Sequence, residues 1–339
     1  LVLAISAETG VSIEAENTLI IFDEIQEVPK ALTSLKYFHE NAPQYAIVAA
    51  GSLLGVALHQ GTSFPVGKVD FLDLYPLNFR EFLCAMGEKQ FVSMLDSCDT
   101  QMVTVFKTKY IERLREYYFV GGMPEVVKDF SEKKDYNRVR AIQKNLINYY
   151  QQDFSKHAEI KLVPRLNLVW NSIPMQLAKE NKKYIYGQVR EGSRAKDFEL
   201  AIQWLLDCGL IHKVQRIQKP DLPLKAYIDF DAFKLFLVDI GLLIAMTDLD
   251  AKVIIEGNKI FTEFKGSLTE QYILQQLISD VGVIPYYYST QNSKGEIDFL
   301  VQGKTSVIPI EVKAEENLKA KSLKAFCEKY QPSYAVRTS

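Results

Sequence analysis

The chain has 339 residues, of which 47% are hydrophobic and 24% are charged, an ordinary composition for a folded protein of two or three domains. Its 40 basic and 42 acidic residues give a net charge of −2, so binding to nucleic acid would need a local basic patch. The four isolated cysteines argue against zinc and disulfides and fit a reducing cytoplasm, and the longest apolar run, Leu235 to Met246, is too short to span a bilayer.

The first informative stretch is a short apolar run, Leu19 to Phe22, that leads directly into Asp23 and Glu24. Such a run predicts a strand buried on both faces of a parallel sheet. Ligands bind at the carboxyl ends of such strands, where Asp23 could hold Mg²⁺ and Glu24 could orient or deprotonate an attacking water. The alternative is a buried strand whose acidic end is merely solvated.

Strand and helix patterns alternate over the next sixty residues, which predicts an α/β fold with a parallel sheet. A second buried strand ends at Gly51 and is followed by Ser52. The expected elements, in order, are a helix from Pro29, a strand over Tyr45–Ala50, a short helix over Leu53–His59, a strand over Phe71–Tyr75 and a helix around Phe79–Met86.

Four segments together carry a family resemblance: LIIFDEIQEVP, AIVAAGSLLGV, SFPVGKVDFLDLYPLNFREFL and YYFVGGMPEVV. Their succession resembles the predicted ATPases of the AAA+ superfamily found in bacteria and archaea. The resemblance implies a P-loop NTPase that uses ATP and Mg²⁺, with Asp23 and Glu24 as its Walker-B acids. It also implies that the strand ending AAGS is the sensor-1 strand, which places Ser52 near the γ-phosphate. Spacing alone favours Ser52 as a small residue at a strand-to-helix turn.

A phosphate loop, G-x-x-x-x-G-K-[ST], is needed to hold the triphosphate in such an ATPase. The segment Gly61 to Val69 is similar, but it has five residues between its glycines, and Val69 replaces the Mg²⁺-binding hydroxyl. We therefore expect that the phosphate-loop half precedes Leu1 and that residues 1–339 alone do not hydrolyse ATP. The N-terminal sheet is then expected to lack its central strand.

The middle of the chain is predicted to be helical up to about residue 160, as a lid or a linker, and then to form a winged helix. Residues 179–219 hold nine Lys/Arg and five Asp/Glu, a local excess of basic groups. Arg190, Arg194 and Lys196 lie near the expected start of the recognition helix and are the candidate DNA-binding residues. A helix-turn-helix that only packs against its neighbours is equally plausible.

The last hundred residues predict a helix over Glu270–Asp280, three strands and a final helix, and Asp298, Glu311 and Lys313 lie on the second and third strands. This order resembles the core of PD-(D/E)XK nucleases. Glu311 and Lys313 are two residues apart, so both point to one face of the strand. Glu270, Asp298 and Glu311 are the candidate Mg²⁺ ligands, and Lys313 would orient the nucleophile. Alternatively, Glu270 closes a capping box with Ser267, and Glu311 and Lys313 form a plain ion pair.

These patterns predict an α/β chain in four parts: a truncated AAA+ core (1–90), a helical lid or linker (91–160), a winged-helix-like region (161–245) and a PD-(D/E)XK nuclease-like α/β domain (246–339). The favoured function is ATP hydrolysis by a DNA-associated cytoplasmic protein, with ATP and DNA as partners, no membrane association and possible oligomerisation. The alternative is a catalytically silent DNA-binding or protein-interaction module that retains the nuclease fold.

Overall fold

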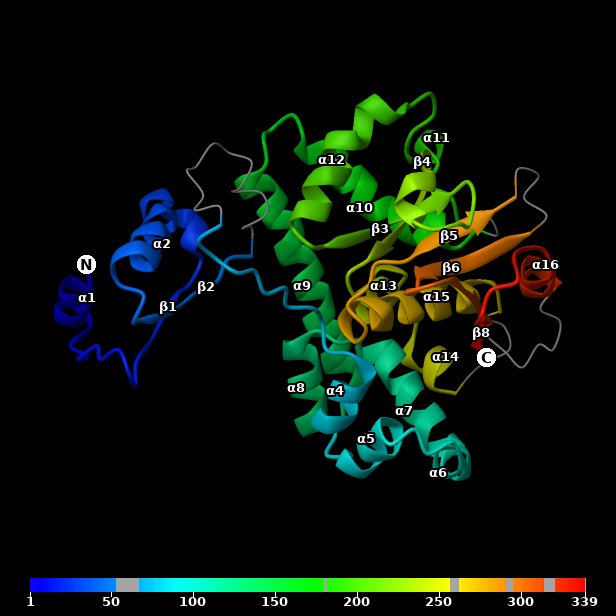
Figure 1. Ribbon diagram of the computed structural model, residues 1–339, viewed down its shortest axis with the longest axis horizontal. Helices are drawn as coiled ribbons and strands as arrows, with labels where there is room; N and C mark the ends of the chain where they lie inside the picture. The colour runs from blue at the N-terminus through cyan, green and yellow to red at the C-terminus, as the bar shows by residue number, and fades with distance from the viewer. Residues whose placement is uncertain (53–66, 180–181, 257–261, 291–294, 314–320, 339) are drawn as a thin grey trace. The chain divides into compact units, whose positions relative to one another are not determined.

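The computed structural model describes residues 1–52, 67–179, 182–256, 262–290, 295–313 and 321–338 (Figure 1). The chain divides into two compact units, Leu1–Leu74 with Gln203–Leu210, and Tyr75–Ile202 with Ile211–Ser339. Each unit is described by itself. The short helix predicted at Leu53–His59 lies outside the described residues.

The N-terminal unit contains a parallel pair of strands, β1 (Leu19–Phe22) and β2 (Ala46–Ala49). They pair from Leu19 with Ala46 to Phe22 with Ala49, which confirms the predicted parallel arrangement. Other elements of the unit are α1 (Val2–Thr9), the 3₁₀ turn η1 (Ile25–Glu27) and α2 (Pro29–Asn41), which begins at a proline as predicted. The buried side chains of α2 are Leu32 and Phe38, and the Phe38 ring lies 6.1 Å from that of Phe22.

Two expectations for this unit were wrong. β1 is not buried on both faces: Ile20 is buried, but Leu19 and Ile21 are 52% and 62% exposed. Residues 71–75 form no strand, and Leu72 and Leu74 are 86% and 90% exposed. Both differences have the same physical cause: a segment forms a strand, and the strand is buried, only where neighbouring elements pair with it and cover it. Among the described residues the sheet has two strands, and no further strand pairs with β2 or with residues 71–75.

The second unit opens with a run of helices, and the loop Gly121–Met123 separates two of them. The helices from here to the end of the chain are α4 (Phe79–Ala85), α5 (Lys89–Asp96), α6 (Thr100–Val105), α7 (Lys107–Val120), α8 (Pro124–Lys133), α9 (Tyr136–His157), α10 (Val163–Leu177), α11 (Tyr186–Val189), α12 (Ala195–Asp207), α13 (Ile240–Met246), α14 (Ala251–Ile255), α15 (Thr262–Ser279) and α16 (Lys321–Tyr330). The last residues of α12, from Gln203 on, are assigned to the first unit. The mostly helical character predicted for residues 100–160 is therefore confirmed.

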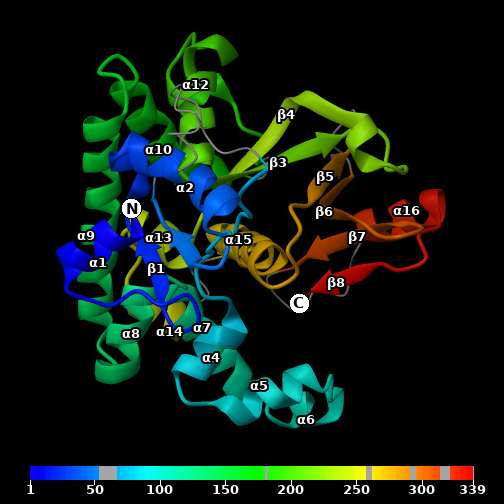
Figure 2. The same cartoon turned by 60° about the vertical axis from the view of Figure 1, so that its left-hand side comes forward.

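The sheet of this unit has six strands among the described residues, in the order β4-β3-β5-β6-β7-β8 (Figures 1 and 2). Their bounds are β3 (Ile211–Ile217), β4 (Ile228–Leu237), β5 (Tyr286–Ser289), β6 (Glu296–Gln302), β7 (Val307–Val312) and β8 (Val336–Thr338). β3 joins β5 in parallel, whereas the pairs β3–β4, β5–β6 and β6–β7 are antiparallel. One sheet therefore crosses the boundary predicted at residue 245.

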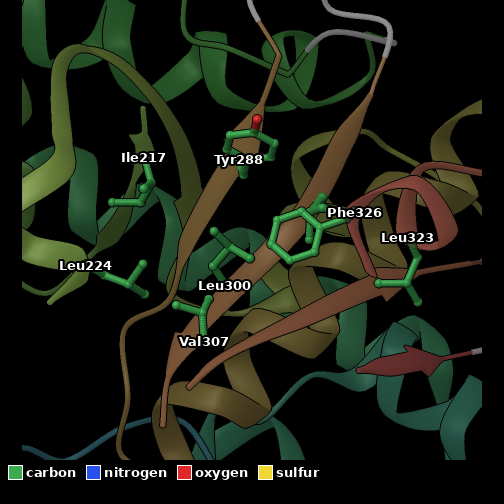
Figure 3. Packing of buried hydrophobic residues seen from close by; sticks show 8 residues of the cluster. Ile217, Leu224, Tyr288, Leu300, Val307, Leu323 and Phe326 are labelled. Atoms are coloured by element: carbon green, nitrogen blue, oxygen red, sulfur yellow. The ribbon is translucent and has the colours of Figure 1, made fainter. Parts of the chain in front are cut away.

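A buried apolar cluster fixes α16 and the β3–β4 turn to this sheet (Figure 3). Leu323 and Phe326 of α16 pack with Leu300 of β6 and with Leu224, which lies in the turn between β3 and β4. The backbone N–H of Leu224 also donates to Oε1 of Gln302, at 2.9 Å. Helices α10–α12 and the hairpin β3–β4 follow in the order expected of a winged helix. The loop that would form the wing is nevertheless tied to the C-terminal strands.

A buried polar network holds α15 against the first helices of the unit. Asp239 accepts hydrogen bonds from the backbone N–H of Gly122 at 2.6 Å and from Nε2 of Gln275 at 3.2 Å. The same Gln275 amide donates to the hydroxyl of Tyr117, which itself donates to the Leu77 carbonyl at 2.6 Å. Gly122 is required here, since a Cβ at this position would lie 2.1 Å from the Leu77 oxygen. The C-terminal part of α15 is thereby tied, through Gln275, to Tyr117 of α7 and to Asp239.

Candidate functional sites

The first candidate site lies at the carboxyl ends of β1 and β2. Asp23 and Glu24 follow β1, and Ser52 lies three residues after the last residue of β2. The Ser52 hydroxyl is 3.2 Å from Oε2 of Glu24, and the Ser52 backbone N–H also donates to that oxygen, at 3.4 Å. The structure thus brings Glu24 and Ser52 together although 28 residues separate them.

The backbone positions these groups by a sharp turn after β1. Glu24 has a φ of 45°, in the left-handed region that few residues other than glycine adopt. Beyond it, the Ile25 N–H donates to the Ala50 carbonyl at 3.0 Å, so the chain returns at once to the end of β2. Asp23 is exposed, and its Oδ1 accepts the Glu24 N–H at 3.1 Å. A carboxylate pair and a hydroxyl at this edge have the chemistry to hold a Mg²⁺-bound phosphate.

The second candidate site lies between α15, β6 and β7. Glu270 comes from α15, Asp298 from β6 and Glu311 from β7, while Lys313 follows β7. Helix α15 begins at Thr262, so Glu270 lies in its interior, and the Ser267 hydroxyl donates to the Leu177 carbonyl at 2.5 Å. The capping-box alternative is therefore wrong.

A bulge in β6 aims Asp298 into this site. Tyr286 pairs with Leu300 and Tyr288 pairs with Ile297, so two residue steps on β5 oppose three on β6. The extra residue lies at Asp298–Phe299, and bulges of this kind commonly redirect a side chain beside a functional site. Oδ2 of Asp298 accepts the Val312 N–H at 2.7 Å, which fixes the carboxyl against β7.

The four residues named from the sequence converge. Oε1 of Glu311 lies 2.6 Å from Nζ of Lys313, and Asp298 lies close enough to Glu270 and Glu311 for their charges to raise its pKa. Glu270 and Glu311 are only 5% and 3% exposed. Such burial of carboxylates is costly unless charges or hydrogen bonds compensate for it.

Two lysines and a glutamate that the sequence analysis did not select complete the site. Lys182 forms an ion pair with Oε1 of Glu270. Nζ of Lys234, in β4, lies 2.5 Å from Oε1 of Glu296, 3.7 Å from Oε2 of Glu270 and 4.8 Å from the Tyr287 ring centre. We call the seven charged residues the carboxylate cluster: Lys182, Lys234, Glu270, Glu296, Asp298, Glu311 and Lys313. A lone lysine in the apolar run FKLFL was a signal for Lys234, whereas nothing in the sequence marked Lys182.

Two effects set the pKa values of the cluster: burial disfavours the charged form of each group, and neighbouring charges favour or disfavour it according to their sign. Burial, together with the Glu270 carboxylate, raises the pKa of Asp298 to about 8, so this carboxyl holds a proton at neutral pH. Burial also acts to raise the pKa of Glu270, but the ammonium groups of Lys182 and Lys234 outweigh it and hold that pKa below its ordinary value. The carboxylates around Lys234 raise its pKa above the usual value despite complete burial.

The cluster has the donor chemistry of a divalent cation site but holds its carboxylates in ion pairs. Oε2 of Glu270 and Oε2 of Glu311 are buried and accept no hydrogen bond. Unsatisfied carboxylate oxygens are the ligands that Mg²⁺ prefers. However, across the described ranges no three His, Cys, Asp or Glu side chains are gathered as a ready metal site, and this includes Asp23 and its neighbours. The carboxylate oxygens are suitable ligands for a divalent cation, but in this structure the same carboxylates form ion pairs with Lys182, Lys234 and Lys313.

The three residues proposed for nucleic-acid binding are all exposed and lie at the turn between α11 and α12. Arg190 follows α11, Arg194 immediately precedes α12, and Lys196 lies in the first turn of α12. The helix begins at Ala195, immediately after Arg194, and the Arg194 N–H donates to Oδ2 of Asp197 at 2.8 Å. No helix in the described part of the chain is long and apolar enough to cross a membrane.

Comparisons with known proteins match three separate stretches of the chain. Residues 3–83 match the model of an AAA domain, residues 111–253 match a domain of unknown function (DUF8612), and residues 265–339 match another domain of unknown function (DUF4143). No curated protein matches the chain. A solved structure, the Walker-type ATPase PABY2304 of Pyrococcus abyssi, is 13% identical, with a TM-score of 0.43 over 73% of this chain. The chain spans 66% of the length of that neighbour.

The match over residues 3–83 supports an AAA-type, P-loop ATPase-like protein, in agreement with the parallel strands β1 and β2.

Proposed function

We propose that this protein binds and hydrolyses ATP, and that the edge of the β1–β2 sheet is part of its nucleotide site. The observation that carries the proposal is the approach of Ser52 to Glu24, with 3.2 Å between the hydroxyl and the carboxylate, at the carboxyl ends of two parallel strands. Parallel sheets bind ligands at this end. The match of residues 3–83 to an AAA domain supports an ATPase of this general type.

Each residue of this edge has a distinct role in the proposed reaction. Asp23 is exposed and would hold the Mg²⁺ ion, which neutralises phosphate charge when it is bound. Glu24 orients the attacking water and accepts its proton. Ser52, beside Glu24, donates a hydrogen bond to the γ-phosphate, so it senses whether that group is present.

Nucleotide binding tests the proposal on the protein produced from its complete reading frame. A fluorescent ATP analogue is titrated with and without Mg²⁺, for the wild type and for Asp23→Ala. We expect Mg²⁺ to strengthen binding to the wild type and to have little effect on the variant. Asp73→Ala, which removes another exposed aspartate of the same unit, is the control and should resemble the wild type. Equal Mg²⁺ dependence in all three proteins would refute the role of Asp23.

A second candidate function is Mg²⁺-dependent cleavage of DNA at the carboxylate cluster. It is favoured by the convergence of two buried carboxylates, Glu270 and Glu311, and the half-buried Asp298 with Lys313, and by the two unsatisfied oxygens of Glu270 and Glu311. In this reaction Glu270, Asp298 and Glu311 would hold the metal, which activates water and neutralises the phosphate when it is bound. Lys313 would stabilise the charge that develops on the phosphate.

Plasmid nicking in Mg²⁺ distinguishes this function from a silent module that retains the nuclease fold. Wild-type protein is compared with Glu311→Gln, and with Glu328→Gln, whose side chain is 67% exposed, as the matched control. Cleavage by the wild type and by the control, lost in Glu311→Gln, would support the nuclease. Binding of DNA without cleavage by any of the three would support the silent module.

DNA association is proposed to use the exposed turn between α11 and α12. Replacing Arg190, Arg194 and Lys196 together by alanine should weaken DNA binding and reduce the slope of log affinity against log salt by up to about 3, roughly one for each lost phosphate contact. Fluorescence anisotropy at several salt concentrations measures both quantities. An unchanged slope would place the DNA elsewhere.

A further inference from the structure

We propose that Lys182 is a built-in competitor of divalent cations at the carboxylate cluster, so that a metal ion binds there only when the Lys182 ammonium leaves Glu270. This inference concerns the regulation of the second candidate site and rests on that proposed function. It adds a residue from outside the predicted nuclease-like domain, in the segment between α10 and α11.

The ion pair places the Lys182 ammonium on a carboxylate oxygen that a metal ion would need as a ligand. Lys182 is paired with Oε1 of Glu270, while Oε2 of the same carboxylate has no hydrogen-bond donor. Its side chain is 11% exposed, so the charge is largely desolvated and the pair is not a surface salt bridge. Glu270 cannot direct both oxygens to a metal ion while Oε1 binds the lysine.

The charge balance of the cluster gives the same result. One of its four carboxyl groups, Asp298, holds a proton at neutral pH, so three carboxylates face three ammonium groups and the cluster is close to neutral without a metal ion. A divalent cation added while all three lysines remain in place would leave an excess of positive charge. The lysines therefore oppose the metal ion electrostatically as well as by occupying its ligands.

Of the three lysines, Lys182 is the one that can withdraw. Lys234 is fully buried in β4, in the register of the β3–β4 pair, and cannot leave without opening the sheet. Lys313 belongs to the same strand segment as its partner Glu311, two residues away, and leaves Oε2 of that partner unsatisfied. Lys182 lies outside regular secondary structure, 88 residues from Glu270, so its side chain can move without breaking a helix or a strand.

Metal binding, measured without reference to activity, tests the inference. Mn²⁺ is titrated calorimetrically into the wild type, Lys182→Met and Lys183→Met. A charge-assisted hydrogen bond that must be broken first should weaken binding by about 10- to 100-fold, so Lys182→Met is expected to bind Mn²⁺ more tightly by that factor. Lys183→Met removes a charge from the neighbouring position, which lies near Asp229, and should bind like the wild type.

Two further variants and a stability measurement distinguish failure of the inference from failure of the metal site. Lys182→Gln should repeat the gain, and Glu311→Gln in the Lys182→Met background should abolish it. Thermal denaturation with and without Mn²⁺ checks that each protein is folded and should give the same order of stabilisation. Equal Mn²⁺ affinity in the wild type and Lys182→Met would overturn the inference while leaving the metal site intact. No Mn²⁺ binding by any variant, all of them folded, would overturn the metal site itself.

Discussion

Replacement of Lys234 by methionine is the perturbation that probes the carboxylate cluster most severely. Lys234 is completely buried, and its ammonium lies 2.5 Å from Glu296 and 3.7 Å from Glu270. Methionine preserves most of the aliphatic chain and removes the charge. Deleting one partner of a buried ion pair typically costs about 3–5 kcal/mol, because the other charge stays buried without compensation.

The structure places this variant at the lower end of that range. Glu270 keeps its ion pair with Lys182, and the Glu296 side chain is 29% exposed, so water can partly solvate it. We therefore expect a loss of about 3 kcal/mol in the free energy of unfolding. Lys324→Met is the control: its side chain is 80% exposed and lies 3.9 Å from Glu328, so it should cost less than about 0.5 kcal/mol.

Urea-induced unfolding followed by circular dichroism measures both changes, and hydrogen exchange at β6 and β7 locates them. The double variant Lys234→Met/Glu296→Gln should be more stable than Lys234→Met by at least about 1 kcal/mol, because it also removes a carboxylate left without its partner. A loss for Lys234→Met no larger than that for Lys324→Met would refute the ion-paired description of the cluster. So would a double variant less stable than the single one.

Two further outcomes follow from the structure. Gly122→Ala should lower the free energy of unfolding by about 1–3 kcal/mol, because its Cβ would meet the Leu77 oxygen at 2.1 Å, whereas Gly266→Ala, with open space around it, should be neutral or stabilising in urea titrations. Burial lowers the pKa of His212 from 6.5 to about 4, so the unfolded chain binds the extra proton and stability should fall as pH decreases from about 6.5 to 4; His212→Phe should remove up to about 3 kcal/mol of that fall, and an unchanged pH profile would contradict it.

The sequence predicted elements well where a local pattern decides them. The proline at the start of α2, the alternation around β1 and β2, and Glu311 of the E-x-K segment, which lies in β7, are all in the elements expected. The prediction failed where the structure of a segment depends on contacts with residues that are distant in the sequence. Residues 71–75 have the composition of a strand, but a strand needs a neighbouring strand, and among the described residues no strand forms a sheet with this segment.

The carboxylate cluster shows the same division between local and long-range signals. Glu270, Asp298, Glu311 and Lys313 could be selected because each lies at a fixed place in a short, ordered set of elements. Lys182 could not, since its role depends on a contact 88 residues away. The joining of β3 and β4 to the C-terminal strands was missed for a similar reason, because the parallel pairing of β3 with β5 leaves no mark on the hairpin sequence.

The central claim is that the β1–β2 edge hydrolyses ATP, and ATP turnover tests it most directly. Phosphate release is measured for the wild type and for Glu24→Gln, on the protein produced from its complete reading frame. We expect Glu24→Gln to retain ATP binding and lose turnover, because the amide can still lie beside Ser52 but cannot accept a proton from water. Wild-type turnover in Glu24→Gln, or no turnover by the wild type at saturating Mg²⁺ and ATP, would contradict the account.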